Sequence, residues 1–172
     1  MKFSHLEQIV NFLQRFKQIN TAYRLSDTQI HLVFDNDTVI TFEMRRDNPS
    51  IFLSPRADRG KRYQAPFDVL LSKRLGRSTI QSVTLHNNDK LIRIVVSQSG
   101  AYKSEITMLQ LEFTGKHTNA ILLDREASVL EALRHVDADV SVRPVRVGQT
   151  LVNPPLPSFT PKSYPIDNVE GF

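Results

Sequence analysis

Short runs of strand-forming residues, separated by turn residues, fill most of this chain and limit the folds that it can adopt. In the second half, Asn, Asp, Ser and Gly residues separate runs at 80–85, 91–97, 105–113 and 120–123. Apolar and β-branched residues bounded in this way are typical of strands. Residues 129–136 continue the pattern, although they could equally form a short helix. The second half is therefore predicted to be all β.

The first half contributes further strands. Residues 29–34 and 38–42 are rich in β-branched and aromatic residues and flank an Asp-Asn-Asp turn, a pattern that predicts a β-hairpin. Residues 50–53 follow Pro49 and predict another short strand.

Two segments carry helix signals. Ser4 and Glu7 have the spacing of a capping box, and apolar residues follow at helical intervals, so residues 4–17 are predicted to form an amphipathic helix. Pro66 suits the first turn of a second helix, and Gly76 is expected to end it. Helices combined with such strands predict an α+β fold.

The composition favours a cytoplasmic protein. The 172 residues include no cysteine, which excludes disulfides and thiolate metal sites. No apolar run approaches the ~20 residues that span a membrane. Glu7 and Gln8 interrupt the N-terminal segment where a signal peptide needs a continuous apolar stretch. We therefore expect no contact with a membrane.

The basic residues are unevenly distributed. The chain has 22 Lys and Arg against 18 Asp and Glu, a net charge of +4. Between positions 56 and 77 only Asp58 and Asp68 oppose seven basic residues: Arg56, Arg59, Lys61, Arg62, Lys73, Arg74 and Arg77. A local excess of this kind suits an anionic partner such as nucleic acid. A solvated basic loop without a partner would have the same composition.

Gly115 and Lys116 interrupt two strand-like runs and raise the question of a phosphate-binding loop. That motif requires a glycine where Gln110 stands and a Ser or Thr where His117 stands, so it is absent. A turn is the simpler interpretation, with Gly115 supplying the conformational freedom. The polar residues that follow, up to Asn119, could contact phosphates if the turn is exposed.

No pattern of catalytic or metal-binding residues is present. The five histidines lack the close spacing of a zinc site, and neither a serine-hydrolase nor a dinucleotide-binding motif occurs. We therefore expect no enzyme activity, no cofactor, no metal and no small-molecule substrate.

The segments 111–124 and 129–155 resemble the N-terminal domain of the NFACT family. These are RqcH-like ribosome quality-control factors, long labelled fibronectin-binding proteins in bacteria. The matching residues are Glu112, Gly115, Lys116, His117, Thr118, Asn119, Leu122, Arg134, Val136, Arg143, Val147, Gly148, Pro154 and Pro155. The predicted second helix resembles a family helix through Pro66, Phe67, Leu71, Lys73, Leu75 and Ile80.

The resemblance implies that residues 1–152 form the family's N-terminal domain. That domain is similar to the N-terminal domain of formamidopyrimidine-DNA glycosylases, a two-sheet β sandwich with flanking helices. The glycosylases use an N-terminal proline as nucleophile, whereas Lys2 stands here, so glycosylase chemistry is not expected. Residues 153–172 contain five prolines and are expected to be a linker to the further C-terminal domains of the family.

The resemblance also implies a function, that of a non-catalytic RNA-binding module. In the family this domain helps to hold tRNA on the large ribosomal subunit at stalled nascent chains, and bacterial relatives add alanine tails. A family Asp-Arg motif that contacts tRNA corresponds to Asp89 and Lys90. Lysine lacks the planar fork of arginine, so base recognition should weaken more than attraction to phosphate.

The predicted nucleic-acid-binding residues are Asp89, Lys90, Arg59, Lys61, Arg62, Lys73, Arg74, Arg77, Lys116, His117 and Asn119. The six basic residues from Arg59 to Arg77 are expected to share one face, with Lys90 nearby. The alternatives are a fibronectin-binding surface adhesin and a glycosylase-like DNA-binding domain without activity.

Overall fold

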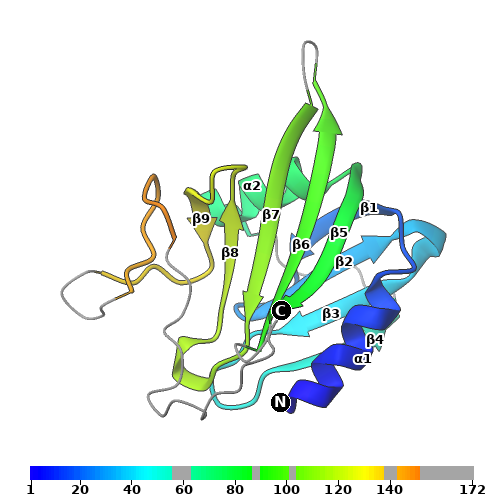
Figure 1. Ribbon diagram of the computed structural model, residues 1–172, viewed down its shortest axis with the longest axis horizontal. Helices are drawn as coiled ribbons and strands as arrows, with labels where there is room; N and C mark the ends of the chain where they lie inside the picture. The colour runs from blue at the N-terminus through cyan, green and yellow to red at the C-terminus, as the bar shows by residue number, and fades with distance from the viewer. Residues whose placement is uncertain (56–62, 87–89, 101–103, 138–142, 152–172) are drawn as a thin grey trace, which may run out of the picture.

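The computed structural model describes residues 1–55, 63–86, 90–100, 104–137 and 143–151 (Figure 1). The predicted binding residues Arg59, Lys61, Arg62 and Asp89 and the predicted linker 153–172 lie outside these ranges. Within them, helix α1 covers Phe3–Leu13 and helix α2 covers Pro66–Leu75. Neither helix is long and apolar enough to cross a membrane.

Nine strands complete the described fold, which is α+β as predicted. They are β1 (Gln18–Arg24), β2 (Gln29–Phe34), β3 (Val39–Glu43), β4 (Ser50–Ser54), β5 (Ser78–His86), β6 (Leu91–Ser99), β7 (Ser104–Glu112), β8 (Asn119–Leu123) and β9 (Val129–Ala132). The segment that could have been strand or helix is thus a strand at 129–132.

The strands form one antiparallel sheet in the order β4-β3-β2-β1-β5-β6-β7-β8-β9, whereas two separate sheets were expected. The junction between β1 and β5 is short, since only Gln18 with Thr79 and Ile19 with Ser78 are paired there. By contrast, β6 and β7 pair over nine residues. The short junction lets β2 and β3 pass behind β5–β7 in Figure 1. One sheet therefore supplies both layers around the core.

A single main core fills the space between the two halves of the sheet. Alternate residues of β6, such as Ile92 and Ile94, point into it, as do Phe34 and Phe42 from the other half. Leu6 and its helical neighbours bring α1 into the same core. A second apolar cluster lies on the opposite face of β8 and β9 and is covered by residues 143–151. Residues 143–151 thereby place Arg143 next to the sheet.

Helix α1 differs from its prediction at both ends. Its first turn is formed on Lys2, whose carbonyl accepts from the His5 and Leu6 amides, so Ser4 lies inside the helix and does not cap it. The helix ends at Leu13 rather than at residue 17. The chain turns there because Phe16 stacks on Phe34 in β2, with ring centroids 4.6 Å apart. Strand β1, which follows, was not predicted.

Helix α2 begins at Pro66 and is capped by Gly76, as predicted. Asp68 fixes its first turn, because the carboxylate accepts from the Ala65 amide at 3.1 Å. The same carboxylate accepts two bonds from Arg24 of β1, at 2.9 and 2.6 Å. Arg24 also lies 4.4 Å from the ring centre of Tyr63. This cluster ties α2 to the middle of the sheet.

His31 in β2 gives the fold a pH dependence. The side chain is buried, and its Nδ1 shares a hydrogen bond of 2.8 Å with the Thr41 hydroxyl. Its Nε2 has no hydrogen-bond partner among the described residues. Burial lowers the pKa of His31 below its usual value of about 6.5. The unfolded chain therefore takes up a proton at a higher pH than the folded chain.

We accordingly expect the free energy of unfolding to fall as the pH drops below about 6.5, by at most ~1.4 kcal/mol per pH unit. His31→Gln keeps an acceptor for Thr41 but does not titrate, so it should remove this loss. Urea unfolding midpoints between about pH 5 and pH 8 measure it, with the exposed His5→Gln as control. An equal pH dependence in His31→Gln and the parent protein would refute the assignment.

Candidate nucleic-acid interface

Three predicted binding residues meet at one end of the sheet. Lys90 immediately precedes β6, and Lys116 and His117 lie in the loop between β7 and β8. The Phe113 amide donates to the Lys90 carbonyl at 3.0 Å and so joins the two loops. Lys90 has a φ of 46°, a left-handed conformation uncommon for lysine. We call this region the loop end.

Lys73, Arg74 and Arg77 lie at the opposite end of the same strands. Gln98, near the end of β6, donates to the carbonyls of Lys73 and Gly76 at 2.8 and 2.7 Å. Strand β5, whose nine residues extend about 26 Å from first to last, separates Arg77 from the loop end. Lys90 therefore does not lie near Lys73, Arg74 and Arg77, contrary to the prediction.

Arg74 is also engaged within the protein. Its guanidinium pairs with Glu105 at 3.1 Å and donates to the Thr107 hydroxyl at 3.3 Å, leaving the side chain 15% exposed. Lys73 and Arg77 are exposed.

The Gly115–His117 segment is a tight 3-10 turn, in agreement with the turn interpretation. Gly115 has a φ of +64°, which glycine adopts easily. The Thr118 hydroxyl closes the turn by donating to the Gly115 carbonyl at 2.6 Å. Thr118 is buried, whereas Lys116 and His117 are exposed. The side chains of Lys116 and His117 thus project into solvent from a backbone that the turn fixes.

Asn119 supports the loop from inside. Only 3% of this residue is exposed. Its side-chain oxygen Oδ1 accepts from the backbone amides of Arg134 and Ala120, both at 2.9 Å. Its side-chain NH₂ group donates to the Arg134 backbone carbonyl at 2.8 Å. These bonds fix the segment after β9 against the start of β8. The structure therefore gives Asn119 a supporting position rather than an exposed one.

Two further arginines complete the loop end. Arg134 donates to the Thr118 carbonyl at 2.7 Å and lies half-buried beside the turn. Burial lowers the pKa of Arg134, and the charge of nearby Arg46 lowers it further, while Glu43 raises it. In Figure 1 the β3–β4 loop, which carries Arg46, lies beside the β7–β8 loop. Arg46 comes from the other half of the sheet and was not predicted as a site residue.

A buried polar network underlies this end. The Glu112 carboxylate, 1% exposed, accepts two bonds from Arg143 at 2.8 and 2.6 Å and one from Gln110 at 2.8 Å. Gln110 in turn accepts from Arg93 at 3.1 and 2.6 Å. Burial lowers the pKa of Arg93, and the charge of Glu112 opposes that effect. The network joins strands β6 and β7 to the 143–151 segment.

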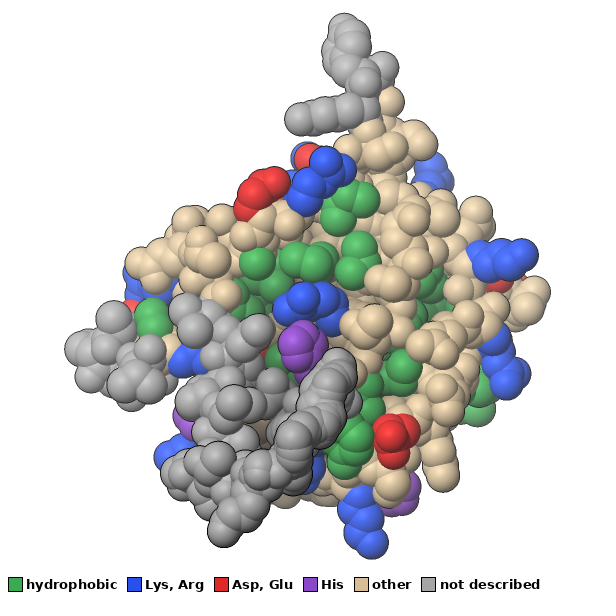
Figure 2. All heavy atoms as spheres, in the orientation of Figure 1, with side chains coloured by type: hydrophobic (Ala, Val, Ile, Leu, Met, Phe, Trp, Pro, Cys, Tyr) green, Lys and Arg blue, Asp and Glu red, His purple; other side chains and the backbone are tan. Residues whose placement is uncertain are grey.

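The loop end is chemically suited to anions. Positive charge comes from the exposed side chains of Lys116 and Arg46 and from the partly exposed Lys90. The Glu112 carboxylate does not neutralise it, because it is already paired with Arg143. Figure 2 shows Lys, Arg and His side chains set among hydrophobic ones on the face formed by β5–β8. Among the described residues, no group of His, Asp or Glu could hold a metal ion. Phosphate groups fit such an arrangement.

The fold and the site together define this protein as an α+β domain with a basic loop end. Over residues 5–170 the sequence matches the family described as NFACT N-terminal and middle domains. Because the match covers nearly the whole chain, the protein belongs to the NFACT family. A search of curated proteins found no match.

Three solved structures share the fold. The N-terminal domain of the fibronectin-binding protein PavA from Streptococcus pneumoniae has a TM-score of 0.78 at 22% identity, covering 88% of this chain and 60% of that one. The N-terminal part of the fibronectin/fibrinogen-binding protein from Streptococcus suis scores 0.79 at 23%, covering 87% and 60%. The fibrinogen-binding protein from Staphylococcus aureus scores 0.73 at 20%, covering 87% and 55%. The chain thus spans less than two thirds of each.

Proposed function

We propose that this protein is a non-catalytic, cytoplasmic RNA-binding module of a ribosome quality-control factor. It would help to hold tRNA on the large ribosomal subunit at stalled nascent chains. Membership of the NFACT family supports the ribosomal context. The observation that carries the proposal is the loop end, where Lys116 and His117 project from a turn fixed by Thr118 and Asn119.

The chemistry of this end favours contact with the RNA backbone. Lys90 and Lys116 are point charges that attract phosphate without the fork that reads a base edge. Arg46 and Arg134 widen the positive area, and their mutual repulsion is relieved when an anion lies between them. The proposed contact does not include Lys73, Arg74 and Arg77, because strand β5, about 26 Å long, separates them from the loop end.

Lys116→Ala tests this proposal. Fluorescence anisotropy with a labelled tRNA over a salt series should show weaker binding and a log–log salt slope smaller by about 0.7–0.9, the value for one lost phosphate contact. Lys17→Ala is the matched control. Lys17 is exposed, and its carbonyl accepts from the Ile80 amide at 2.8 Å, which places it at the far end of β5. Equal slopes for both variants would contradict the proposal.

A second candidate function is binding of fibronectin, because two of the solved relatives are described as fibronectin-binding proteins. Immobilised fibronectin tests it with the same chain and the same Lys116→Ala variant. A DNA duplex in the salt series tests the remaining alternative, a glycosylase-like DNA-binding domain. Tighter binding to fibronectin or to the duplex than to tRNA would replace the RNA proposal.

A further inference from the structure

Arg93 lies on the outer face of β5–β7, the side of these strands that is turned away from the main core. Ile94, the next residue in β6, points into that core, so Arg93 points the other way. The residues paired with Arg93 across the sheet are Thr84 of β5 and Gln110 of β7. Lys90 of the loop end stands just before the same strand. Arg93 is therefore close to the proposed RNA contact.

Hydrogen bonds hold the guanidinium of Arg93 in one orientation. Its Nε and Nη2 donate to the Gln110 side-chain oxygen at 3.1 and 2.6 Å. The Gln110 NH₂ group donates in turn to Glu112 at 2.8 Å. Among the described residues, Glu112 is the one acid whose charge affects the pKa of Arg93, and its carboxylate is already paired with Arg143. The side chain of Arg93 is thus positioned before a ligand binds.

One edge of this guanidinium remains available to a ligand. The bonds to Gln110 use the edge formed by Nε and Nη2. Nη1 makes no hydrogen bond with the described residues, and only His31 Nε2 among their side chains is both buried and without a partner. Nη1 is therefore in contact with solvent. The edge formed by Nη1 and Nη2 can donate two parallel bonds to a planar partner.

The surroundings of Arg93 suit the flat face of a base. Val95, on the same face of β6, is partly exposed and is paired with the partly exposed Met108. On the side of β5, Ser82 and Thr84 are exposed and small, so they leave room beside the guanidinium. Hydrophobic side chains and cations are intermixed on this face in Figure 2. A base can lie on the apolar side chains while its edge accepts from Arg93.

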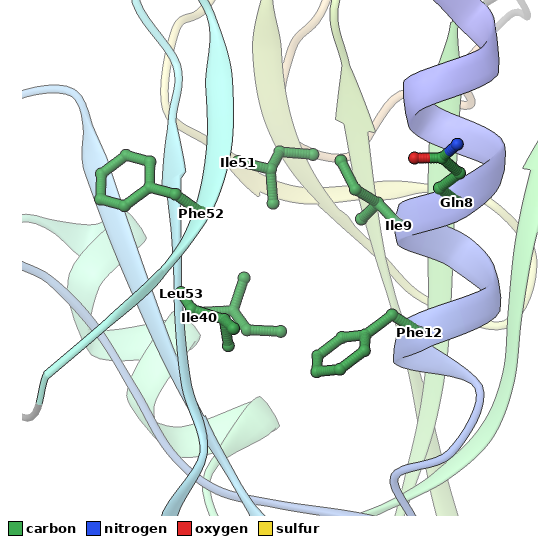
Figure 3. Close-up of a pocket in the computed structure, with 7 residues that line it drawn as sticks. All are labelled: Gln8, Ile9, Phe12, Ile40, Ile51, Phe52 and Leu53. Carbon is green, nitrogen blue, oxygen red and sulfur yellow. The ribbon is translucent and has the colours of Figure 1, made fainter.

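The apolar groove between α1 and β4 offers no comparable donor. In Figure 3 apolar side chains of both elements line it, among them Phe12 and Leu53. Gln8 is the one polar side chain among the described residues of this lining. The groove therefore cannot supply a charge-assisted hydrogen bond to a nucleotide, whereas the outer face supplies one beside the loop end.

We propose that Arg93 reads an unpaired guanine of the bound RNA through the O6 and N7 atoms of the base. This inference rests on the proposed function, in which Lys90 and Lys116 hold phosphates at the loop end. Guanine presents two acceptors on this edge, whereas adenine places a donor beside N7. The base is unpaired, because side chains do not reach this edge inside an RNA helix. Gln110 is a positioning residue, since it acts through Arg93.

A comparison of RNA probes tests this without any variant. Short fluorescein-labelled oligouridines carry one central guanine, adenine or 7-deazaguanine, the last of which lacks the N7 acceptor. Fluorescence anisotropy should show that the guanine probe binds at least about fivefold more tightly than either of the others, the lower end of what a bidentate base contact contributes. Equal binding of the guanine and 7-deazaguanine probes would overturn the proposal.

Two variants assign the preference to a residue. Arg93→Lys keeps the charge but not the fork, so the preference for guanine should fall below about twofold. Arg125→Lys is the matched control, because Arg125 is exposed in the turn between β8 and β9. It should leave the preference unchanged. A preference that survives in folded Arg93→Lys would refute the role of Arg93.

Lys116→Ala separates this inference from the proposed function. The variant should weaken the three probes alike, because the phosphate that it contacts is the same in each. A common loss without any preference for guanine would refute the role of Arg93 and leave the RNA contact standing. Binding of tRNA but of no oligouridine would also overturn the inference. Binding of neither would contradict the proposed function itself.

Discussion

Glu112→Ala is expected to lower the free energy of unfolding by about 3–5 kcal/mol, the usual cost of removing one partner of a buried ion pair. The carboxylate is 1% exposed and neutralises Arg143, whose side chain is itself only 12% exposed. Without it, the guanidinium and the Gln110 NH₂ group would stay buried and lose their acceptor. Thermal unfolding should move down by roughly 6–20 °C for a chain of this length.

Two further variants separate the charge from the packing. Glu112→Gln keeps the shape and one acceptor, so its loss should be clearly smaller. Combining Glu112→Met with Arg143→Met removes both charges, and the pair should cost less than the two single changes added together. Urea unfolding of the parent protein, Glu112→Met, Arg143→Met and the double variant measures this difference. Additive losses would show that Glu112 and Arg143 do not stabilise the fold as a pair.

Asp68→Ala is expected to destabilise the protein by a similar amount, about 3–5 kcal/mol. The change breaks the two bonds from Arg24, at 2.9 and 2.6 Å, and removes the acceptor for the Ala65 amide at the start of α2. A lost helix cap alone costs about 1 kcal/mol, so most of the loss should come from the unpaired Arg24.

Asp68→Asn is the matched control for this prediction, because an amide oxygen can still accept from Ala65 while the charge is lost. It should retain the cap and lose only the charged part of the Arg24 pair. Urea unfolding compares the two variants, and hydrogen exchange at α2 shows whether the helix loosens first. Equal and small losses in both variants would mean that α2 is held mainly by Phe67 and Leu71 in the core.

Most of the strands could be predicted because their runs of apolar and β-branched residues are bounded by turn residues. Strand β2 has the predicted bounds, and β3 and β4 lie within one residue of theirs. Strand β1 was missed because a bulge between Ile19 and Thr21 shifts the alternation, and Ala22 and Tyr23 are buried side by side. The single sheet could not be predicted either, since it depends on two residue pairs between β1 and β5.

The candidate site was only partly predictable. Gly115 indicated the turn, and the exposure of Lys116 follows from that turn. The position of Asn119 could not be read from the motif, because its amide is bonded to Arg134, fifteen residues away. Arg46 joins the site from a distant strand pair. Conversely, Lys73 is close to Lys90 in sequence, but strand β5 carries them to opposite ends.

Lysine footprinting tests most directly the claim that tRNA contacts the loop end. The chain is acetylated with a lysine reagent in the presence and absence of tRNA, and the modification rate of each lysine is measured by mass spectrometry. We expect slower modification of Lys90 and Lys116 when tRNA is bound, with Lys17 and Lys73 unchanged. Protection of Lys73 with Lys90 and Lys116 left reactive would contradict it.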